Sequence, residues 1–308
     1  MPPTILITGA AGFVGGHVTR EARRHRVRLR LVRHHRTPLA PTADVVRADL
    51  ADPGSLRGIC DGVDVLVHCA ARIGGDTETN EAVNARGTAA LVAEARRAGV
   101  RRVVQLSTAS VYGRGTFRGS RPEDLVRNPA SVTSRTRAAA EDAVLGAGGI
   151  VLRPHLVYGA GDAWVGPGLA RILRALPGTV DGWPARTSVI AVTDLARLLV
   201  AAALAPDGGL TRSVYHAAHP EPVAVSALLR AVAECGSIAW PRTRIGAERA
   251  RAVLAEHGQP PSALDMLTTD HVFDSAPLWS DLRQSPGAPF PAAFRREADW
   301  YREALRAG

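Results

Sequence analysis

The stretch Ile5-Leu6-Ile7-Thr8-Gly9-Ala10-Ala11-Gly12-Phe13-Val14-Gly15 decides the fold class of this 308-residue chain. A short apolar run, typical of a buried strand, leads into three glycines, and a helix pattern follows to about Arg24. Glycine lets the backbone approach a pyrophosphate, and the free N–H groups of a helix N-terminus attract its charge. A strand before the glycines and a helix after them therefore favour a dinucleotide-binding turn. The alternative is a glycine turn with a structural role only.

Strand-like and helix-like segments alternate from this turn to about residue 160. Apolar or alternating runs predict strands at 27–33, 44–50, 63–71, 102–110 and 150–154. Helical patterns lie between them at 53–60, 81–98 and 131–145. Such alternation is typical of an α/β fold with a Rossmann-type, doubly wound parallel sheet.

Beyond Gly159 the alternation loosens and stretches rich in Pro and Gly appear. We therefore expect a cofactor-binding Rossmann domain at 1–159, to which 187–206 returns as a strand and a buried helix. The segments 160–186 and 207–308 would form a smaller, irregular C-terminal substrate lobe.

Composition excludes several kinds of chemistry. The chain contains no lysine, so all 38 Lys and Arg positions are arginine, and no Schiff-base lysine or lysine general base exists. The net charge of +9 does not predict nucleic-acid binding, because only 5% of residues are aromatic and no nucleic-acid module accompanies the arginines. Three cysteines without a CxxC pair predict neither a disulfide framework nor a metal site.

The chain also lacks signals for a membrane. Its best apolar run, Leu198 to Ala205, is far shorter than the ~18 residues of a spanning helix. The N-terminus has no basic leader before its first strand. We therefore expect a cytoplasmic protein without a membrane partner, and make no prediction of its oligomeric state.

The end of the second predicted strand indicates which dinucleotide binds. An acidic residue there would bond to a ribose 2′-OH, whereas arginine accommodates a 2′-phosphate. This chain has Arg33, His34, His35 and Arg36. The sequence therefore predicts NADPH, with Arg33 as the main contact, Arg36 as the second and Asp49 beside the adenine. The alternative is a solvated basic surface.

Several spaced motifs carry a resemblance to a known family. They are TGAAGFVG (8–15), ADL (48–50), HCAA (68–71), VNARGT (83–88), QLSTASVYG (105–113), LRPHLVYG (152–159), VTDLA (192–196) and the closing DW-Y (299–301). In this order the motifs resemble the extended short-chain dehydrogenase/reductases, the group that includes NAD-dependent epimerases and dehydratases. The resemblance covers nearly the whole chain. It implies a nicotinamide cofactor across the carboxyl ends of the strands and a substrate under the C-terminal lobe.

The resemblance also implies which residues make contacts. The cofactor contacts would be Gly9, Ala11, Gly12, Phe13, Val14, Gly15, Leu50, Cys69, Ala70, Ala71, Ser107, Arg137 and Pro154. The substrate contacts would be Arg72, Ser110 and Tyr158. Trp164 and Trp183 are candidate walls for a flat ligand, with core packing as the other interpretation of each. Asn84 would orient the helix predicted at 131–145.

The catalytic set of this family is Ser or Thr, Tyr and Lys, the last two spaced YxxxK. Thr108 matches the hydroxyl position, but the YxxxK positions hold Thr133 and Arg137. An aliphatic hydroxyl is a far weaker acid than a phenol, and arginine stays protonated and does not relay a proton. Arg137 can still bond a nicotinamide ribose. His155 is the best alternative acid, with a structural role as its other interpretation.

Two functions remain open. The favoured one is an NADPH-dependent reductase, because Thr108 and the Arg137 donor are retained. The chain also resembles atypical ketoreductases of aromatic polyketide biosynthesis. This resemblance implies an aromatic ketone of the angucyclinone type, and a phenol of the substrate would serve as proton source. The alternative is a non-catalytic regulatory protein that senses NADP(H).

Overall fold

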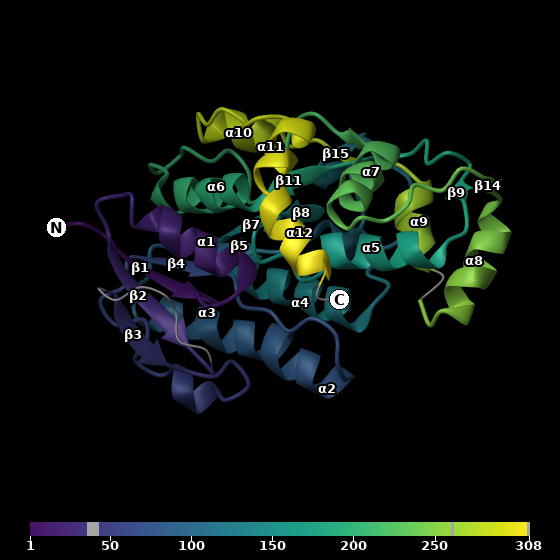
Figure 1. Cartoon of the computed structure of the whole chain (residues 1–308). Coiled ribbons are helices and arrows are strands. Elements are labelled where there is room, and N and C mark those ends of the chain that lie inside the picture. Colours follow the sequence, from purple (N-terminus) through teal and green to yellow (C-terminus); the bar gives the residue numbers. More distant parts are fainter. Residues whose placement is uncertain (36–42, 260–261, 307–308) are drawn as a thin grey trace.

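A parallel sheet forms the centre of the molecule (Figure 1). The computed structural model describes residues 1–35, 43–259 and 262–306. Within these residues the sheet has seven strands in the order β12-β7-β5-β4-β1-β2-β3. The strands are β1 (Thr4–Thr8), β2 (Arg28–Arg33), β3 (Asp44–Arg47), β4 (Val65–His68), β5 (Arg102–Leu106), β7 (Ile150–Arg153) and β12 (Val214–His216). Every pairing is parallel, which confirms the predicted Rossmann-type fold.

Helices cover both faces of this sheet, because its strands are apolar on both sides. Ile5 and Ile7 face α1 (Phe13–Ala22) and α6 (Val192–Leu204) in one hydrophobic cluster. Leu6 points to the other face, where α3 (Gly87–Arg97) and α4 (Val132–Gly146) lie. Figure 1 shows these helices on opposite sides of the strands. Consecutive residues of β1 therefore point to opposite faces of the sheet.

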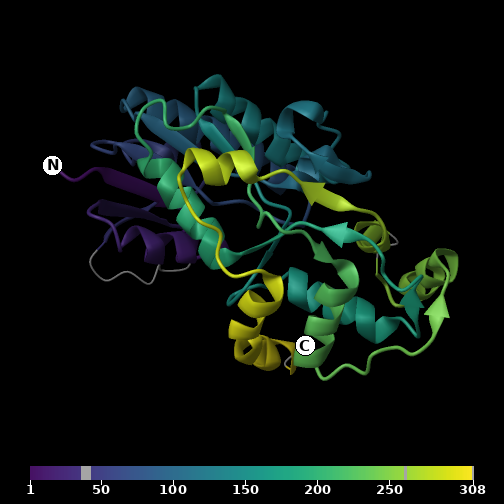
Figure 2. The same cartoon turned by 90° about the horizontal axis from the view of Figure 1, so that it is seen from above.

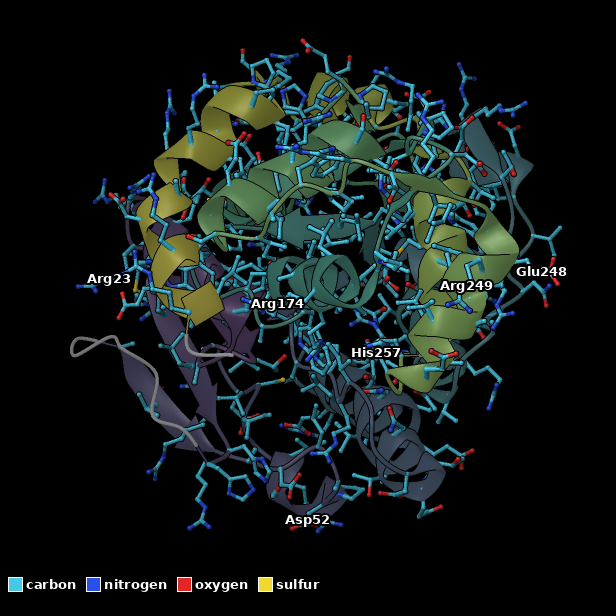
Figure 3. The ribbon with its side chains drawn as sticks, turned by 45° about the vertical axis from the view of Figure 1, so that its right-hand side comes forward. Arg23, Asp52, Arg174, Glu248, Arg249 and His257 are labelled. Carbon is cyan, nitrogen blue, oxygen red and sulfur yellow. The ribbon has the colours of Figure 1, made fainter. Side chains whose placement is uncertain are left out.

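The C-terminal part has a hydrophobic core of its own, built around Trp183 and Tyr301. Figure 2 shows its helices beside the central sheet. Its helices are α5 (Val165–Ala175), α7 (Val225–Cys235), α8 (Ala247–Glu256), α9 (Ser262–Thr268), α11 (Phe290–Arg296) and α12 (Ala298–Arg306). Arg174 ties α5 to α12 by donating to the Leu305 carbonyl at 2.8 Å, while Glu248, Arg249 and His257 mark α8 on the outer flank (Figure 3).

Short strands connect this part to the sheet. A four-stranded sheet contains β13 (Val223–Ala224), β10 (Arg186–Thr187), β15 (His271–Phe273) and β6 (Phe117–Ser120). Two pairs complete the strands, β8 (Leu156–Tyr158) with β11 (Val189–Ala191) and β9 (Thr179–Val180) with β14 (Arg244–Ile245). The remaining helical elements are η1 (Pro53–Leu56), α2 (Thr77–Asn80), η2 (Glu81–Arg86), η3 (Ala109–Tyr112), η4 (Pro122–Asp124) and α10 (Ala276–Asp281).

Some predicted elements differ in extent. The helix expected at 53–60 is the single 3₁₀ turn η1, and the chain turns at Gly58, whose φ of +78° suits glycine. The helix expected at 81–98 begins as the π-helical η2 before α3. The strand expected at 102–110 ends at Leu106.

The division into two domains remains a prediction. As expected, 187–206 returns to the sheet as β11 and α6, and α6 packs in the cluster of Ile5 and Ile7. However, β12 lies in the segment that we assigned to the lobe, and it pairs with β7 in the central sheet. None of the described helices combines the length and the apolar character that a membrane span requires.

Candidate active site

A cleft of about 530 Å³ opens where β1, β4, β5 and β7 end. Residues that directly follow these strands therefore meet in it. Its lining consists of Gly9, Gly12, Phe13, Val14, Gly15, Cys69, Ala70, Ala71, Ile73, Leu106, Ser107, Thr108, Arg137, Pro154, His155, Val157, Asp162, Trp164 and Val165. Most of the predicted cofactor residues are among them. The predicted Ala11 belongs to the glycine turn but not to the lining.

The glycine turn requires glycine for steric reasons. Gly9 has a φ of +68°, and a Cβ there would lie 2.7 Å from the Ala70 nitrogen. A Cβ on Gly15 would lie 2.1 Å from the Gly9 carbonyl oxygen. The Gly12 nitrogen donates to that carbonyl at 2.8 Å, and α1 starts at the next residue without an acidic side chain in its first turn. The turn fits a pyrophosphate at the N-terminus of α1.

Arg137 supplies a buried cation beside this turn. It lies on α4, is 9% exposed and donates from Nη2 to the Leu106 carbonyl. Burial lowers its pKa, and the carboxylate of Glu141, one helical turn later, raises it. Burial raises the pKa of Cys69 to about 12, so this neighbour is a neutral thiol. Arg137 thus retains donors for a hydroxyl-bearing ligand.

Neutral polar groups fix the strand ends around the cleft. Burial, followed by the charge of Arg137, lowers the pKa of His68 to about 3. The neutral ring bridges Thr8 at 2.7 Å and Thr88 at 2.9 Å. As the resemblance implied, Asn84 contacts α4, because its amide donates to the Thr136 hydroxyl at 3.0 Å.

Ser107 lines the cleft, but its hydroxyl is bonded to a buried side chain outside the cleft. Its hydroxyl donates to the buried Glu141, which also forms an ion pair with Arg153 at 2.5 Å. Arg153 in turn donates to the Tyr112 hydroxyl at 2.7 Å. Tyr112 therefore belongs to a buried network rather than to the cleft, and its hydroxyl does not replace the missing catalytic tyrosine.

The predicted hydroxyl, Thr108, does line the cleft. Its Oγ1 accepts a hydrogen bond from the Ser110 nitrogen and donates to the Ser110 hydroxyl, both at 3.1 Å. Ser110, which we expected to touch the substrate, is exposed outside the lining. A ligand oxygen can replace Ser110 Oγ as acceptor because a hydroxyl proton rotates.

Thr133 occupies the tyrosine position but does not line the cleft. Its hydroxyl donates to Asn80 Oδ1 and accepts from the Gly74 nitrogen, both at 3.2 Å. It fastens the loop after Ala71 to α4. The family pattern places Thr133 in the catalytic set, and we expected it to shape the pocket without donating the proton. The structure instead has its hydroxyl bonded within the protein, outside the lining, and its role stays a prediction.

His155 lines the cleft at the end of β7. Burial, together with the nearby His271 and His216, lowers its pKa to about 3. The ring is therefore neutral at neutral pH, and an imidazolium acid at this position is not supported. A neutral imidazole still donates one hydrogen bond and accepts another.

The predicted substrate residues divide between cleft and core. Trp164 lines the cleft and is 56% exposed. Trp183 is only 1% exposed in the C-terminal core, and Tyr158 packs against Phe290 and Phe294. The predictions for Trp183 and Tyr158 are corrected accordingly. Arg72 is exposed beside the lining, with its backbone bound to Asn84.

Five lining residues were missed from the sequence: Ile73, Leu106, Val157, Asp162 and Val165. Ile73 is 46% exposed, a rare exposure for a large apolar side chain in this structure. Asp162 accepts from the Trp164, Val165 and Gly166 nitrogens and thereby caps α5. Asp162 lies three residues after the end of the LRPHLVYG motif, which is a local signal; Ile73 has no such signal.

The edge expected to hold a 2′-phosphate carries two arginines. Arg33 ends β2 and is in register with Arg47 of β3, so both lie on the same side of the sheet. His34 Nε2 lies 3.0 Å from an Asp49 carboxylate oxygen. Asp49 and Leu50 lie beyond the end of β3, outside the cleft lining. Arg36 lies outside the described residues, so its predicted role has no structural counterpart here.

Comparison with known proteins agrees with this geometry. The pattern of the NAD dependent epimerase/dehydratase family matches residues 5–218, which is more than half of the chain. The chain belongs to this family. It is therefore an enzyme of the NAD(P)-dependent oxidoreductase type, as the glycine turn and the strand-end residues indicate.

Relatives of known activity are similar over nearly the full length. A 2-alkyl-3-oxoalkanoate reductase of Stenotrophomonas maltophilia is 30% identical, covering 95% of this chain and 97% of its own. A 3 beta-hydroxysteroid dehydrogenase/Delta 5-->4-isomerase of Mycobacterium tuberculosis is also 30% identical, covering 92% and 86%. A farnesyl-dihydroquinoline-oxide ketoreductase of Stigmatella aurantiaca is 29% identical, covering 80% and 77%.

Solved structures share the fold at lower identity. WbmH of Bordetella bronchiseptica, solved with NAD+, has a TM-score of 0.78 at 22% identity and covers 98% of this chain and 99% of its own. The UDP-glucose 4-epimerase of Thermotoga maritima has a TM-score of 0.77 at 18% identity and covers the same shares. At this identity the likeness concerns the fold alone.

Proposed function

We propose that this protein is an NADPH-dependent ketoreductase of secondary metabolism that reduces an aromatic polyketide ketone of the angucyclinone type. The observation that carries the proposal is the lining of the cleft. Among the described residues that line it, none is a tyrosine or a lysine, and the hydroxyl at the tyrosine position is bonded to Asn80 and Gly74. The tyrosine that usually donates the proton in this family is therefore missing at position 133, where this chain has threonine.

The residues present fit a dinucleotide. Gly9, Gly12 and Gly15 form a turn that a Cβ would fill, and the buried Arg137 offers donors beside it. When bound, NADPH supplies a hydride to the carbonyl carbon. Arg33 and Arg47 at adjacent strand ends are suited to a 2′-phosphate, which supports NADPH over NADH.

The carbonyl oxygen must gain a proton as its carbon gains the hydride. The titratable groups of the lining are unsuited to supply it. Cys69 and Arg137 are weak acids, His155 is neutral, and Asp162 is bonded to three backbone nitrogens and to Tyr301. We propose that a phenol next to the ketone transfers its proton to the carbonyl oxygen and then regains one from solvent.

An apolar, flat substrate fits the exposed side chains of the cleft. Ile73 and Trp164 are large, apolar and exposed, and they approach the cleft from the loop after β4 and from the start of α5. Exposed apolar groups at a cleft mark a binding surface more often than a solvated one. By their names, two relatives act on a 2-alkyl-3-oxoalkanoate and on a 3 beta-hydroxysteroid, and both of these substrates carry large hydrocarbon parts, which is consistent with this substrate class.

A matched pair of ketones tests the proposal. The probes are a tetralone with a hydroxyl beside its ketone and the methyl ether of the same compound. NADPH consumption, followed by absorbance, should proceed with the free phenol and slow by about a hundredfold with the ether, because general acid catalysis contributes roughly 10²–10⁴. Binding of both ketones should remain comparable. Equal turnover of the two would remove the phenol from the mechanism.

The lack of a suitable acid among the described lining residues also favours the second candidate function, a regulator that binds NADP(H) without turnover. The two functions differ in what NADPH does in the presence of ketone. A regulator binds it tightly and leaves its absorbance unchanged with every ketone of an aromatic panel. An enzyme consumes it with at least one of them.

A further inference from the structure

His155 and Thr108 lie side by side at the ends of neighbouring strands. The Ala109 nitrogen donates to the Pro154 carbonyl at 2.8 Å, and these two residues are the chain neighbours of Thr108 and His155. Both side chains line the cleft. Two neutral donors are thus available at the place where the hydride acceptor would lie under the proposed function.

An aromatic and imidazole cluster holds the His155 ring from behind. The ring of His271, on β15, is parallel to it with 5.0 Å between centroids and an interplanar angle of 1°. Phe273 packs at 5.4 Å, and His216 contacts Phe273 in turn. His271 is itself held, because its Nδ1 donates to the Thr269 carbonyl at 3.0 Å.

The surroundings of the two ring nitrogens indicate which of them carries the proton in neutral His155. Its Nε2 is buried without a partner. Orphaned buried N–H groups are rarer in proteins than orphaned acceptors, since the donor loses a strong bond to water. The preferred neutral tautomer therefore has its proton on Nδ1, the nitrogen that is left to meet a ligand.

The charge state of His155 follows from the same neighbours. The groups that act on it are His271 from β15 and His216 from β12, and both lower its pKa together with burial. His216 lies close to the Arg153 guanidinium, whose charge further disfavours a cation in this cluster. The ring is a donor and not an acid over the physiological range.

We propose that Nδ1–H of neutral His155 and the hydroxyl of Thr108 form a paired donor site for the substrate carbonyl oxygen, with His271 as the residue that positions His155. This inference rests on the proposed ketoreductase function. Negative charge develops on that oxygen during hydride addition, and fixed donors stabilise it more in the transition state than in the ground state. An alkoxide has three lone pairs, so the two protein donors and a substrate phenol are compatible.

The first test reads the tautomer directly. Nitrogen NMR of histidine-labelled protein, with the His155 signals assigned by comparison with His155→Gln, should show Nδ1–H and no titration between about pH 5 and pH 8. Adding the hydroxylated tetralone to the NADP+ complex should shift the Nδ1 signal. An Nε2–H tautomer or titration in this range would overturn the inference.

The second test uses paired substitutions. His155→Asn keeps an amide donor near the Nδ1 position and should retain kcat within about fivefold, whereas His155→Leu should lose roughly a hundredfold in kcat with little change in NADPH affinity. His271→Phe preserves the stacking surface and should keep the Nδ1–H signal. His271→Ala should release the ring, broaden that signal and lower kcat by about tenfold.

The outcomes separate this inference from the proposed function. If the wild type reduces the tetralone and His155→Leu does so equally well, the donor site is wrong and the ketoreductase stands. If the tetralone shifts the Nδ1–H signal but is not reduced, the donor site stands and the ketoreductase does not. If the tetralone neither shifts the signal nor is reduced, both are overturned for this class of ketone.

Discussion

The two halves of the cleft use different kinds of atoms. The cofactor half, at the ends of β1 and β4, is built from the backbone of Gly9, Gly12 and Gly15. The other half, at the ends of β5 and β7, presents individual side chains, and we propose that Thr108 and His155 act on the substrate there. The first half follows the family pattern, whereas the second departs from it at the YxxxK positions.

If the proposed function is right, an enzyme of this family has changed its chemistry and kept its cofactor. A backbone site tolerates an arginine-rich, lysine-free composition, since it requires only glycine at a few positions. A catalytic site that depends on a tyrosine side chain as its acid loses that acid when the tyrosine is replaced. Here the hydroxyl of Thr133, on α4, instead forms hydrogen bonds with Gly74 and Asn80. These bonds connect α4 to the loop that contains Ile73.

The largest effect is expected in the cofactor half, from Gly15→Ala. Its Cβ would lie 2.1 Å from the Gly9 carbonyl oxygen, so the turn must open. We expect NADPH affinity to fall by about a hundredfold, equal to about 2.8 kcal/mol. The matched control is Gly16→Ala, whose Cβ would lie 3.6 Å from the Ala10 carbonyl oxygen, an ordinary contact. Fluorescence titration of NADPH checks both, with circular dichroism as the test of folding.

Arg33→Asp should have the next largest effect. The acidic side chain would repel a 2′-phosphate and bond to a 2′-OH, so the ratio of NADPH to NADH affinity should fall by roughly tenfold to a hundredfold. Arg28→Asp, at the opposite end of β2, serves as the control for charge alone. A wild type that prefers NADH, or an equal effect of both variants, contradicts the assignment of Arg33.

Buried histidines of the cleft should make the fold sensitive to acid. The pKa values of His68 and His155 fall to about 3 in the folded protein, so the unfolded chain takes up protons below about pH 6.5 and the folded protein does not. Stability is then fully present above about pH 6.5 and decreases toward pH 4, by at most about 1.4 kcal/mol per pH unit for each histidine. Urea unfolding at several pH values measures this slope.

Two variants test whether His155 contributes to this decrease of stability with falling pH. His155→Phe should reduce it, because the titrating group is gone from the unfolded chain as well. His25→Asn is the matched control, since it also removes one histidine, and the His25 side chain is 42% exposed. A slope that does not differ between wild type and His155→Phe would show that other groups control the acid limit.

The smallest effect is expected at the position where the family has its tyrosine. Thr133→Ala removes two hydrogen bonds to the loop but no group from the cleft lining, so kcat should change by less than about threefold. The KM for the tetralone should rise modestly as Ile73 becomes less fixed. Thr133→Ser keeps the hydroxyl and is the control. A loss of several hundredfold in kcat with intact NADPH binding would make the Thr133 hydroxyl catalytic after all.

Sequence reasoning predicted the parallel sheet and the position of the glycine turn between β1 and α1, because both depend on local signals. The glycine turn, the apolar strands and the strand-end positions are each contained in fewer than ten consecutive residues. Parallel strands then bring their carboxyl ends together by geometry alone. The same reasoning placed Thr108, Arg137 and His155 in one cleft, and the structure has them there.

Its errors concern residues whose surroundings are distant in the chain. Trp183 and Tyr158 were expected at the substrate, but the helices between 225 and 306 bury them in a core that no local pattern reveals. Ile73 was overlooked because its exposure depends on a loop fastened by Asn80 and Thr133.

By itself, the sequence determined that this chain is a Rossmann-type oxidoreductase without lysine chemistry and without tyrosine at the YxxxK position. Only the tertiary structure decided that the Thr133 hydroxyl forms hydrogen bonds with Gly74 and Asn80. It also decided that His155 is a neutral ring stacked on His271. The reason is physical. A backbone turn is made by neighbouring residues, whereas the burial and charge state of a side chain depend on groups more than a hundred residues away, such as His271 beside His155.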